Sequence, residues 1–155
     1  MILNILGGVF LALCVFAAMH DVNRLTIPNW LNLMLAGLFV PAAAISGVPM
    51  EIGLFAFNIF GGGDAKMIPA VMLWLGPDAG ITFIFVMALA GGAFALLILS
   101  VRRLMPAAAL PGLIRAPFEE NAGVPYGVAI AAGVLVAAPA SPFLANLLSE
   151  ISLFS

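Results

Sequence analysis

The sequence predicts an all-α protein, a polytopic transmembrane helix bundle of about six membrane segments, the third of them unusually short. Of its 155 residues 65% are apolar and only 8% are charged, against roughly 25% charged residues in a soluble domain. The mean hydropathy of +1.24 points the same way. The charges interrupt apolar runs, several of which reach the length of about 20 residues that a membrane-spanning helix needs. We therefore expect residues 1–155 to form a single integral membrane domain.

The composition also excludes several classes of protein. Soluble, disordered and nucleic-acid-binding proteins all need many more charges than this chain carries. Its single cysteine, Cys14, can form neither an internal disulfide nor a tetracysteine zinc site. The apolar runs lack the strict alternation of a transmembrane barrel. The first run, 1–20, lacks the basic start of a signal peptide, so we interpret it as the first membrane helix.

The expected elements follow from the apolar runs between the charges. Gly76, Pro77 and Asp78 predict an outer turn between the fourth and fifth segments. The stretch 104–123, which contains three prolines, is the only extended loop candidate. In chain order, the expected segments cover about 2–20, 28–46, 50–62, 66–75, 79–101 and 125–148.

The basic residues predict the orientation of these segments. They lie at Arg24, at Lys66 and within 102–115, and basic residues mark the cytoplasmic side of a membrane protein. If these three basic sites all lie on the cytoplasmic side, the third membrane segment, at about 50–62, must cross the membrane but is too short to do so. The eleven residues between Pro49 and Gly61 span about 17 Å as a helix, against the ~30 Å of the hydrocarbon core. Either this segment is a half-membrane helix, or residues are missing relative to a functional ancestor.

Two aspartates at the borders of apolar runs are the candidates for chemistry, because an ionisable residue at a membrane helix is costly and marks function by default. Asp21 follows the first run, and Asp64 follows the glycines at 61–63. The predicted orientation puts both on the cytoplasmic side. Two carboxylates at one site do not both ionise easily, so the ionised one can take a proton from water while the protonated one polarises a peptide carbonyl. Taken singly, Asp21 could cap the start of the second helix, and the glycines could form a tight turn.

Three short motifs lie in order along the chain, separated by apolar runs. They are Asp21 followed by Ile27-Pro28-Asn29, then Gly61-x-Gly63-Asp64-x-Lys66, then Pro125-Tyr126-Gly127. This set resembles the type IV prepilin peptidases, bacterial inner-membrane aspartic proteases of the GxGD type. The small size and lone cysteine resemble the short form associated with tight-adherence (Flp) pili. The resemblance spans about residues 20–133, and the short third crossing departs from it.

The resemblance implies that Asp21 and Asp64 are the catalytic pair. It also implies substrate- and site-shaping roles for residues in the motifs: Pro28, Asn29, Gly61, Gly63, Lys66 and Tyr126. The implied substrates are prepilins and pseudopilins, whose basic leader is cut just after a glycine at the cytoplasmic face of the inner membrane. The lipid bilayer is the other expected partner. No metal, nucleotide or other cofactor is implied, and no nucleic acid.

Two other functions are compatible with the same aspartates. A non-enzymatic membrane bundle, such as a transporter subunit or a pilus assembly factor, would use them as an ion or proton path. A presenilin-like protease that cuts within the bilayer would share the GxGD motif. The elements Ile27-Pro28-Asn29 and Pro125-Tyr126-Gly127 argue against that second alternative.

Structural interpretations stand beside these functional ones. Lys66 could extend its ammonium group to the membrane interface instead of ordering the GxGD loop. We expect Trp30 and Trp74 to anchor the protein at the membrane interface. We expect Gly91-Gly92 and Gly123-x-x-x-Gly127 to permit close helix packing and to take no part in the chemistry.

Overall fold

All regular elements of the described chain are helices, which confirms the predicted all-α class. The computed structural model describes residues 2–46, 63–120 and 122–145. The predicted short third segment, about 50–62, lies outside the described residues. In chain order, the elements are α1 (Ile2–Arg24), α2 (Asn29–Ser46), α4 (Gly63–Leu104), η1 (Ala107–Ala109), α5 (Gly112–Arg115), η2 (Ala116–Phe118), α6 (Tyr126–Ala137) and η3 (Ala138–Ala140).

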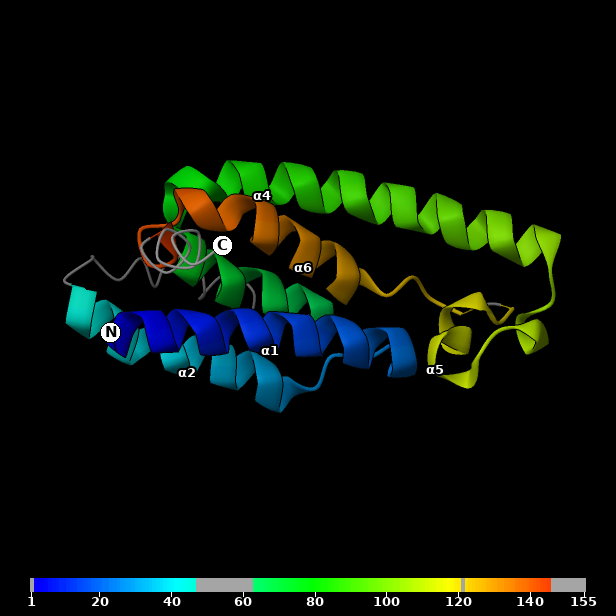
Figure 1. The fold of residues 1–155 in the computed structure, drawn as a ribbon, viewed down its shortest axis with the longest axis horizontal. Helices are drawn as coiled ribbons and strands as arrows, with labels where there is room; N and C mark the ends of the chain where they lie inside the picture. Colours follow the sequence, from blue (N-terminus) through cyan, green and yellow to red (C-terminus); the bar gives the residue numbers. More distant parts are fainter. Residues whose placement is uncertain (1, 47–62, 121, 146–155) are drawn as a thin grey trace, which may run out of the picture.

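The helix α4 consists of two halves that run in opposite directions, and the reversal falls at Gly76 (Figure 1). Gly76 has φ 71° and ψ 175°, a backbone conformation that side-chain-bearing residues rarely adopt. Pro77, which follows, has no N–H to continue the helical hydrogen bonds. The break predicted at Gly76-Pro77-Asp78 is therefore confirmed. Figure 1 shows α1, α2, both halves of α4 and α6 lying lengthwise beside one another.

Three of the described helices are long and apolar enough to cross a membrane. They cover Ile2–Arg24, Asn29–Ser46 and Ala65–Leu104, the last including the break at Gly76. The outer surface carries large apolar side chains, among them Ile5, Ile81 and Leu89, each more than half exposed. A soluble protein rarely exposes so much continuous apolar surface, whereas lipid tails cover it at no cost. These features indicate a membrane protein.

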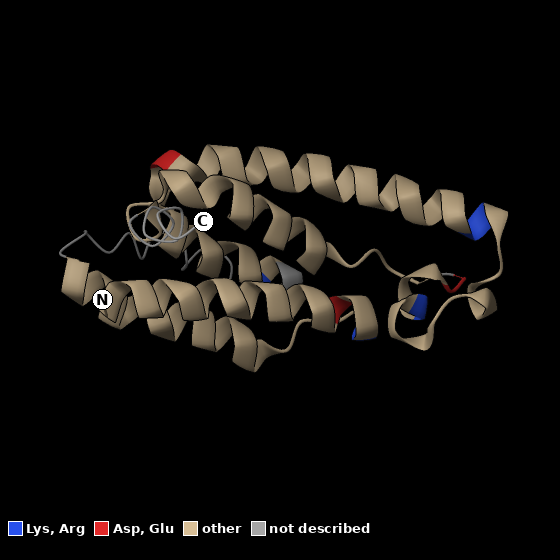
Figure 2. Ribbon diagram, viewed as in Figure 1, with Lys and Arg blue, Asp and Glu red and all other residues tan. Residues whose placement is uncertain are grey.

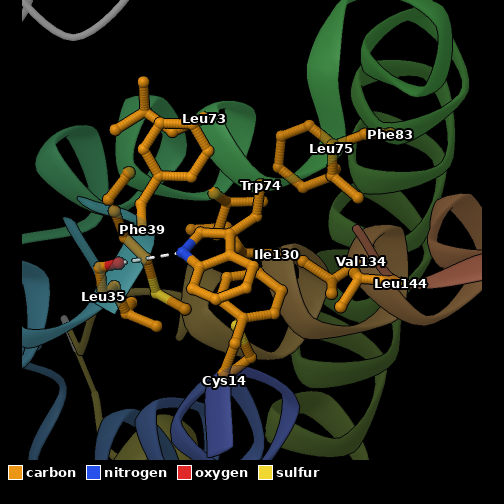
Figure 3. Close-up of a cluster of buried hydrophobic side chains, with 14 of the residues drawn as sticks. Cys14, Leu35, Phe39, Leu73, Trp74, Leu75, Phe83, Ile130, Val134 and Leu144 are labelled. Atoms are coloured by element: carbon orange, nitrogen blue, oxygen red, sulfur yellow. Dashed lines mark hydrogen bonds between the residues drawn. The ribbon is translucent and has the colours of Figure 1, made fainter. Parts of the chain in front are cut away.

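Trp74 lies at the centre of the core, so the prediction that it anchors the membrane interface is wrong. Its side chain is 0% exposed and stacks on Phe10 of α1, with ring centroids 4.6 Å apart. Its indole N–H donates to the carbonyl oxygen of Leu35 in α2 at 2.9 Å. Figure 3 shows the indole surrounded by side chains from α1, α2 and α6. Trp30, in contrast, is 51% exposed, as an interfacial side chain would be.

The helix α6 is shorter than the predicted segment at about 125–148, of which residues 146–148 lie outside the described residues. The α-helix α6 ends at Ala137, a single turn of 3₁₀ helix follows, and Ser141 is extended with φ −78° and ψ 132°. Pro139 and Pro142 cannot donate helical hydrogen bonds, which accounts for the interruption. The Ser141 hydroxyl donates to the carbonyl oxygen of Trp74 at 2.6 Å, satisfying a group next to the Gly76 break. This bond joins the residue that follows η3 to the turn in α4.

Candidate active site

Asp21 lies in the last turn of α1 and is only 2% exposed. Its Oδ2 accepts a hydrogen bond of 2.7 Å from the backbone N–H of Gly127, in the first turn of α6. This oxygen caps the start of α6, a bond that the structural alternative for Asp21, a cap at the second helix, does not account for. Burying a carboxylate is costly unless it is hydrogen-bonded. The Gly127 N–H and the partial positive charge at the α6 N-terminus offset that cost.

Gly127 allows this close approach because it has no side chain. A Cβ atom there would lie 3.0 Å from Cβ of Asp21 and 3.3 Å from the carbonyl oxygen of Ala17. The close packing predicted at Gly127 is confirmed, and its N–H in addition donates to the Asp21 carboxylate. One sequence signal indicates an anion-binding helix start here, although it does not identify Asp21 as the bound carboxylate. Pro125 directly precedes an apolar run, which marks a helix start whose first N–H groups attract an anion.

The turn between α1 and α2 carries the residues of the first motif. Leu25 adopts a positive φ of 52°, and its N–H donates to the carbonyl oxygen of Asp21 at 2.7 Å. This left-handed residue ends α1 as an αL cap, so the chain turns back immediately after Asp21. The ring Nδ1 of His20 donates to the carbonyl oxygen of Thr26 at 2.7 Å and closes the same turn. Ile27 is buried in the core.

Lys66 connects the second motif to the first. Its Nζ donates to Oδ1 of Asn29, the first residue of α2, at 3.1 Å. The first turn of α4 therefore lies beside the first turn of α2, and Pro28, the residue before Asn29, is half-buried at this junction. The alternative in which Lys66 only extends to the interface does not account for this bond.

Asp64 belongs to the same first turn of α4. Gly63 and Asp64 are the first two residues of that helix, and Gly61 lies outside the described residues. The structure thus brings the described part of the second motif, residues 63–66, close to the start of α2. The pairing of the two aspartates stays a prediction.

Tyr126 packs at the junction between α6 and the second half of α4. Its side chain is 45% exposed. A Cβ atom at Gly91 would lie 3.5 Å from Cε1 of Tyr126 and 3.4 Å from Cβ of Ala129, so α6 sits close over the Gly91 backbone. The predicted packing role of Gly91 agrees with these contacts. At Gly92 and Gly123 a Cβ atom would meet no other atom within 4 Å, so the close packing predicted there is wrong. The tyrosine ring thereby helps fix the first turn of α6, where Gly127 holds Asp21.

A pocket of about 230 Å³ lies between α1, α5 and α6. Val22 and Val128 contribute to its walls, and they directly follow Asp21 and Gly127 in the sequence. The volume is below that of pockets for drug-sized molecules, roughly 300–1,000 Å³. Its lining is almost entirely apolar: Ala18, Met19, Val22, Asn23, Leu113, Ile114 and Val128.

The charges are distributed unevenly along the bundle. Figure 2 shows the lysine and arginine residues toward the end where α1 finishes and the 105–123 segment lies. The opposite end, at the Gly76 turn, carries acidic but no basic charge within the described ranges. Asp21 thus lies toward the basic end of the molecule.

Comparison with known proteins identifies the family. The model of the type IV leader peptidase family matches residues 8–96, more than half of the chain. The matched range includes Asp21, Asn29, Asp64 and Lys66, whereas Gly127 lies beyond it. No curated protein and no solved structure matches the chain. Two of the three motifs lie within the matched range, and the match confirms the predicted resemblance: the chain belongs to the type IV leader peptidase family.

Proposed function

We propose that this protein is a membrane-embedded aspartic endopeptidase that removes the leader peptides of Flp-like type IV prepilins and pseudopilins. Membership of a leader peptidase family supports peptide-bond cleavage as the reaction class. The observation that carries the aspartic chemistry is the buried Asp21 carboxylate, held by the N–H of Gly127. A buried, specifically hydrogen-bonded carboxylate toward the basic end of a membrane bundle is typical of a functional group.

Asp64 is the proposed partner of Asp21. The hydrogen bond between Lys66 and Asn29 ties the start of α4 to the start of α2. Only residues 25–28 separate the end of α1 from α2, so the junction remains near the last turn of α1. Asp64 precedes Lys66 by two residues. These short connections favour a site between the two aspartates at this end of the bundle.

The proposed reaction is general acid–base hydrolysis. Two carboxylates at close range do not both keep a negative charge. The Gly127 N–H and the α6 N-terminus favour the charge on Asp21, so Asp21 takes the proton from the attacking water. Asp64 keeps its proton and donates it toward the carbonyl oxygen of the scissile bond. The roles exchange as the tetrahedral intermediate collapses and the leaving amine is protonated.

The proposed location is the cytoplasmic face of the bacterial inner membrane. The basic residues lie toward the same end of the bundle as Asp21 (Figure 2), and basic residues favour the cytoplasmic side. A leader peptide that has not crossed the membrane would meet the site there. The apolar outer surfaces of α1, α2 and α4 would contact lipid.

Cleavage of a prepilin by the purified protein in lipid nanodiscs tests the proposal. Asp21→Asn and Asp64→Asn should each lower the rate at least about 100-fold, the lower range for loss of a general acid or base. Asp78→Asn is the matched control, because Asp78 is an exposed acid beside the Gly76 turn, and it should cleave at the wild-type rate. Mass spectrometry of the products locates the cut.

A normal cleavage rate in either Asp21→Asn or Asp64→Asn would show that the pair is not the catalytic machinery. An intact prepilin combined with pH-dependent ion flux through the wild-type protein would instead favour the non-enzymatic bundle.

A further inference from the structure

Arg102, near the end of α4, holds the chain segment that leads into α6. Its Nη2 group donates two hydrogen bonds, to the carbonyl oxygens of Pro117 at 2.5 Å and Ala122 at 2.8 Å. Both bonds start from one nitrogen, whose two N–H groups each serve one carbonyl. The Arg102 side chain is partly buried. Its guanidinium group thus clamps both ends of residues 117–122 against α4.

Few side chains of the segment before α6 are fully buried. Pro117 is the only buried residue of η1, α5 and η2. A segment with so little buried surface opens easily unless specific bonds hold it. Because the guanidinium group of Arg102 is charged, its two hydrogen bonds are stronger than bonds between neutral groups.

The segment that Arg102 clamps ends directly before the first turn of α6. Ala122 lies four residues before Tyr126, and no helix intervenes between them. The Gly127 N–H then meets the Asp21 carboxylate at 2.7 Å. The chain between Ala122 and Gly127 is short enough to transmit a change in position from the bonds of Arg102 to the Asp21 contact.

We propose that Arg102 is a positioning residue for the Asp21 carboxylate. By fixing Pro117 and Ala122, it sets where α6 begins and therefore where the Gly127 N–H holds Asp21. This inference rests on the proposed function, because it assigns Arg102 a kinetic effect through a catalytic aspartate. A displacement of about 1 Å in a catalytic group can lower a rate by ~100-fold. A partial release of the α6 start should therefore slow cleavage without weakening substrate binding.

Kinetics of leader cleavage provide the first test. Arg102→Gln should lower kcat about tenfold and leave KM unchanged, a smaller loss than full misplacement produces. Arg102→Lys should recover part of that loss, since an ammonium group can still donate to both carbonyls. Arg103→Gln is the matched control, because Arg103 is the adjacent, exposed arginine, and it should have wild-type kinetics.

A double-mutant cycle with Gly127→Ala separates positioning from a general structural role. If Arg102 acts through Gly127, adding Arg102→Gln to Gly127→Ala should lower kcat less than twofold further. A further tenfold loss in that background would show that Arg102 acts independently of the Asp21 contact and would overturn the inference. Wild-type kcat in Arg102→Gln alone would overturn it as well.

Amide hydrogen exchange tests the same inference without any cleavage. Arg102→Gln should raise exchange at residues 126–128 and leave residues 133–137, later in α6, unchanged. Faster exchange along all of α6, or no change at 126–128, would contradict the positioning role. This measurement keeps the two claims apart: a wild-type protein that cleaves no prepilin contradicts the proposed function, while the exchange data still decide whether Arg102 sets the start of α6.

Discussion

The backbone N–H of Gly127 donates a 2.7 Å hydrogen bond to Oδ2 of Asp21, across 106 residues of sequence. This bond joins the last turn of α1 to the first turn of α6. It places a buried carboxylate where a helix N-terminus offers both a donor and partial positive charge. The bond also gives the Pro125-Tyr126-Gly127 motif a physical role, which is to hold one member of the proposed catalytic pair.

Gly127→Ala should remove this arrangement. The added Cβ would lie 3.1 Å from Oδ2 of Asp21 and 3.3 Å from the carbonyl oxygen of Ala17, so α6 or Asp21 must shift. We expect the leader cleavage rate to fall between about tenfold and 100-fold, as for a misplaced catalytic group. Gly123→Ala is the control, because a Cβ there meets no atom within 4 Å. Equal rates for the two alanine variants would contradict the role of Gly127.

The bond between Lys66 and Asn29 should matter for activity more than for stability. Asn29→Leu removes the acceptor with little change in size, and we expect cleavage to fall about fivefold, equivalent to about 1 kcal/mol. Asn29→Asp keeps an oxygen for the ammonium group and should retain the wild-type rate. Lys66→Met should match Asn29→Leu, and the double variant should show no further loss. If Asn29→Leu cleaves normally, Lys66 acts elsewhere, for example on lipid headgroups.

Replacement of Trp74 should destabilise the fold far more than replacement of Trp30. Trp74→Phe loses ring volume in a fully buried position and the hydrogen bond to Leu35, so we expect a cost of about 2–4 kcal/mol. Trp30→Phe changes a half-exposed side chain and should alter stability by less than about 0.5 kcal/mol. Reversible unfolding in mixed micelles measures both. Similar losses for the two variants would contradict the central position of Trp74.

The helices could be predicted from the sequence because each depends on local information. Charges and prolines mark their ends, and the Gly76-Pro77-Asp78 break follows from the conformations of glycine and proline. The end of α6 at Ala137 does not follow from hydropathy, because the apolar run continues beyond it and mean hydropathy does not measure how Pro139 and Pro142 interrupt helical hydrogen bonds. Trp74 was misplaced for a related reason. The local sequence around a tryptophan near the end of an apolar run is the same whether the indole lies at the membrane interface or in the core. Here the indole lies in the core, where its N–H finds a hydrogen-bond acceptor.

The candidate site could be predicted only in part. Asp21 stands out because a carboxylate at a membrane helix is costly, and that cost is visible in one sequence. Its partner Gly127 depends on the packing of α1 against α6, which no local pattern encodes. The hydrogen bonds of Arg102 to two backbone carbonyls could not be predicted from the sequence either. Every residue has a backbone carbonyl, so the sequence does not identify which ones accept. Charged side chains that are costly to bury can be recognised from the sequence, whereas the backbone groups that bind them cannot.

The central claim is that Asp21 and Asp64 meet at one site, and thiol cross-linking tests it most directly. Cys14 is the only cysteine, so Cys14→Ala gives a clean background. In it, Asp21→Cys with Asp64→Cys should cross-link efficiently through a reagent that spans a few ångströms. Asp21→Cys with Asp78→Cys is the matched control and should not react, because Asp78 adjoins the Gly76 turn at the opposite end of the bundle. Failure of the first pair to cross-link, or equal reaction of both pairs, would contradict the account.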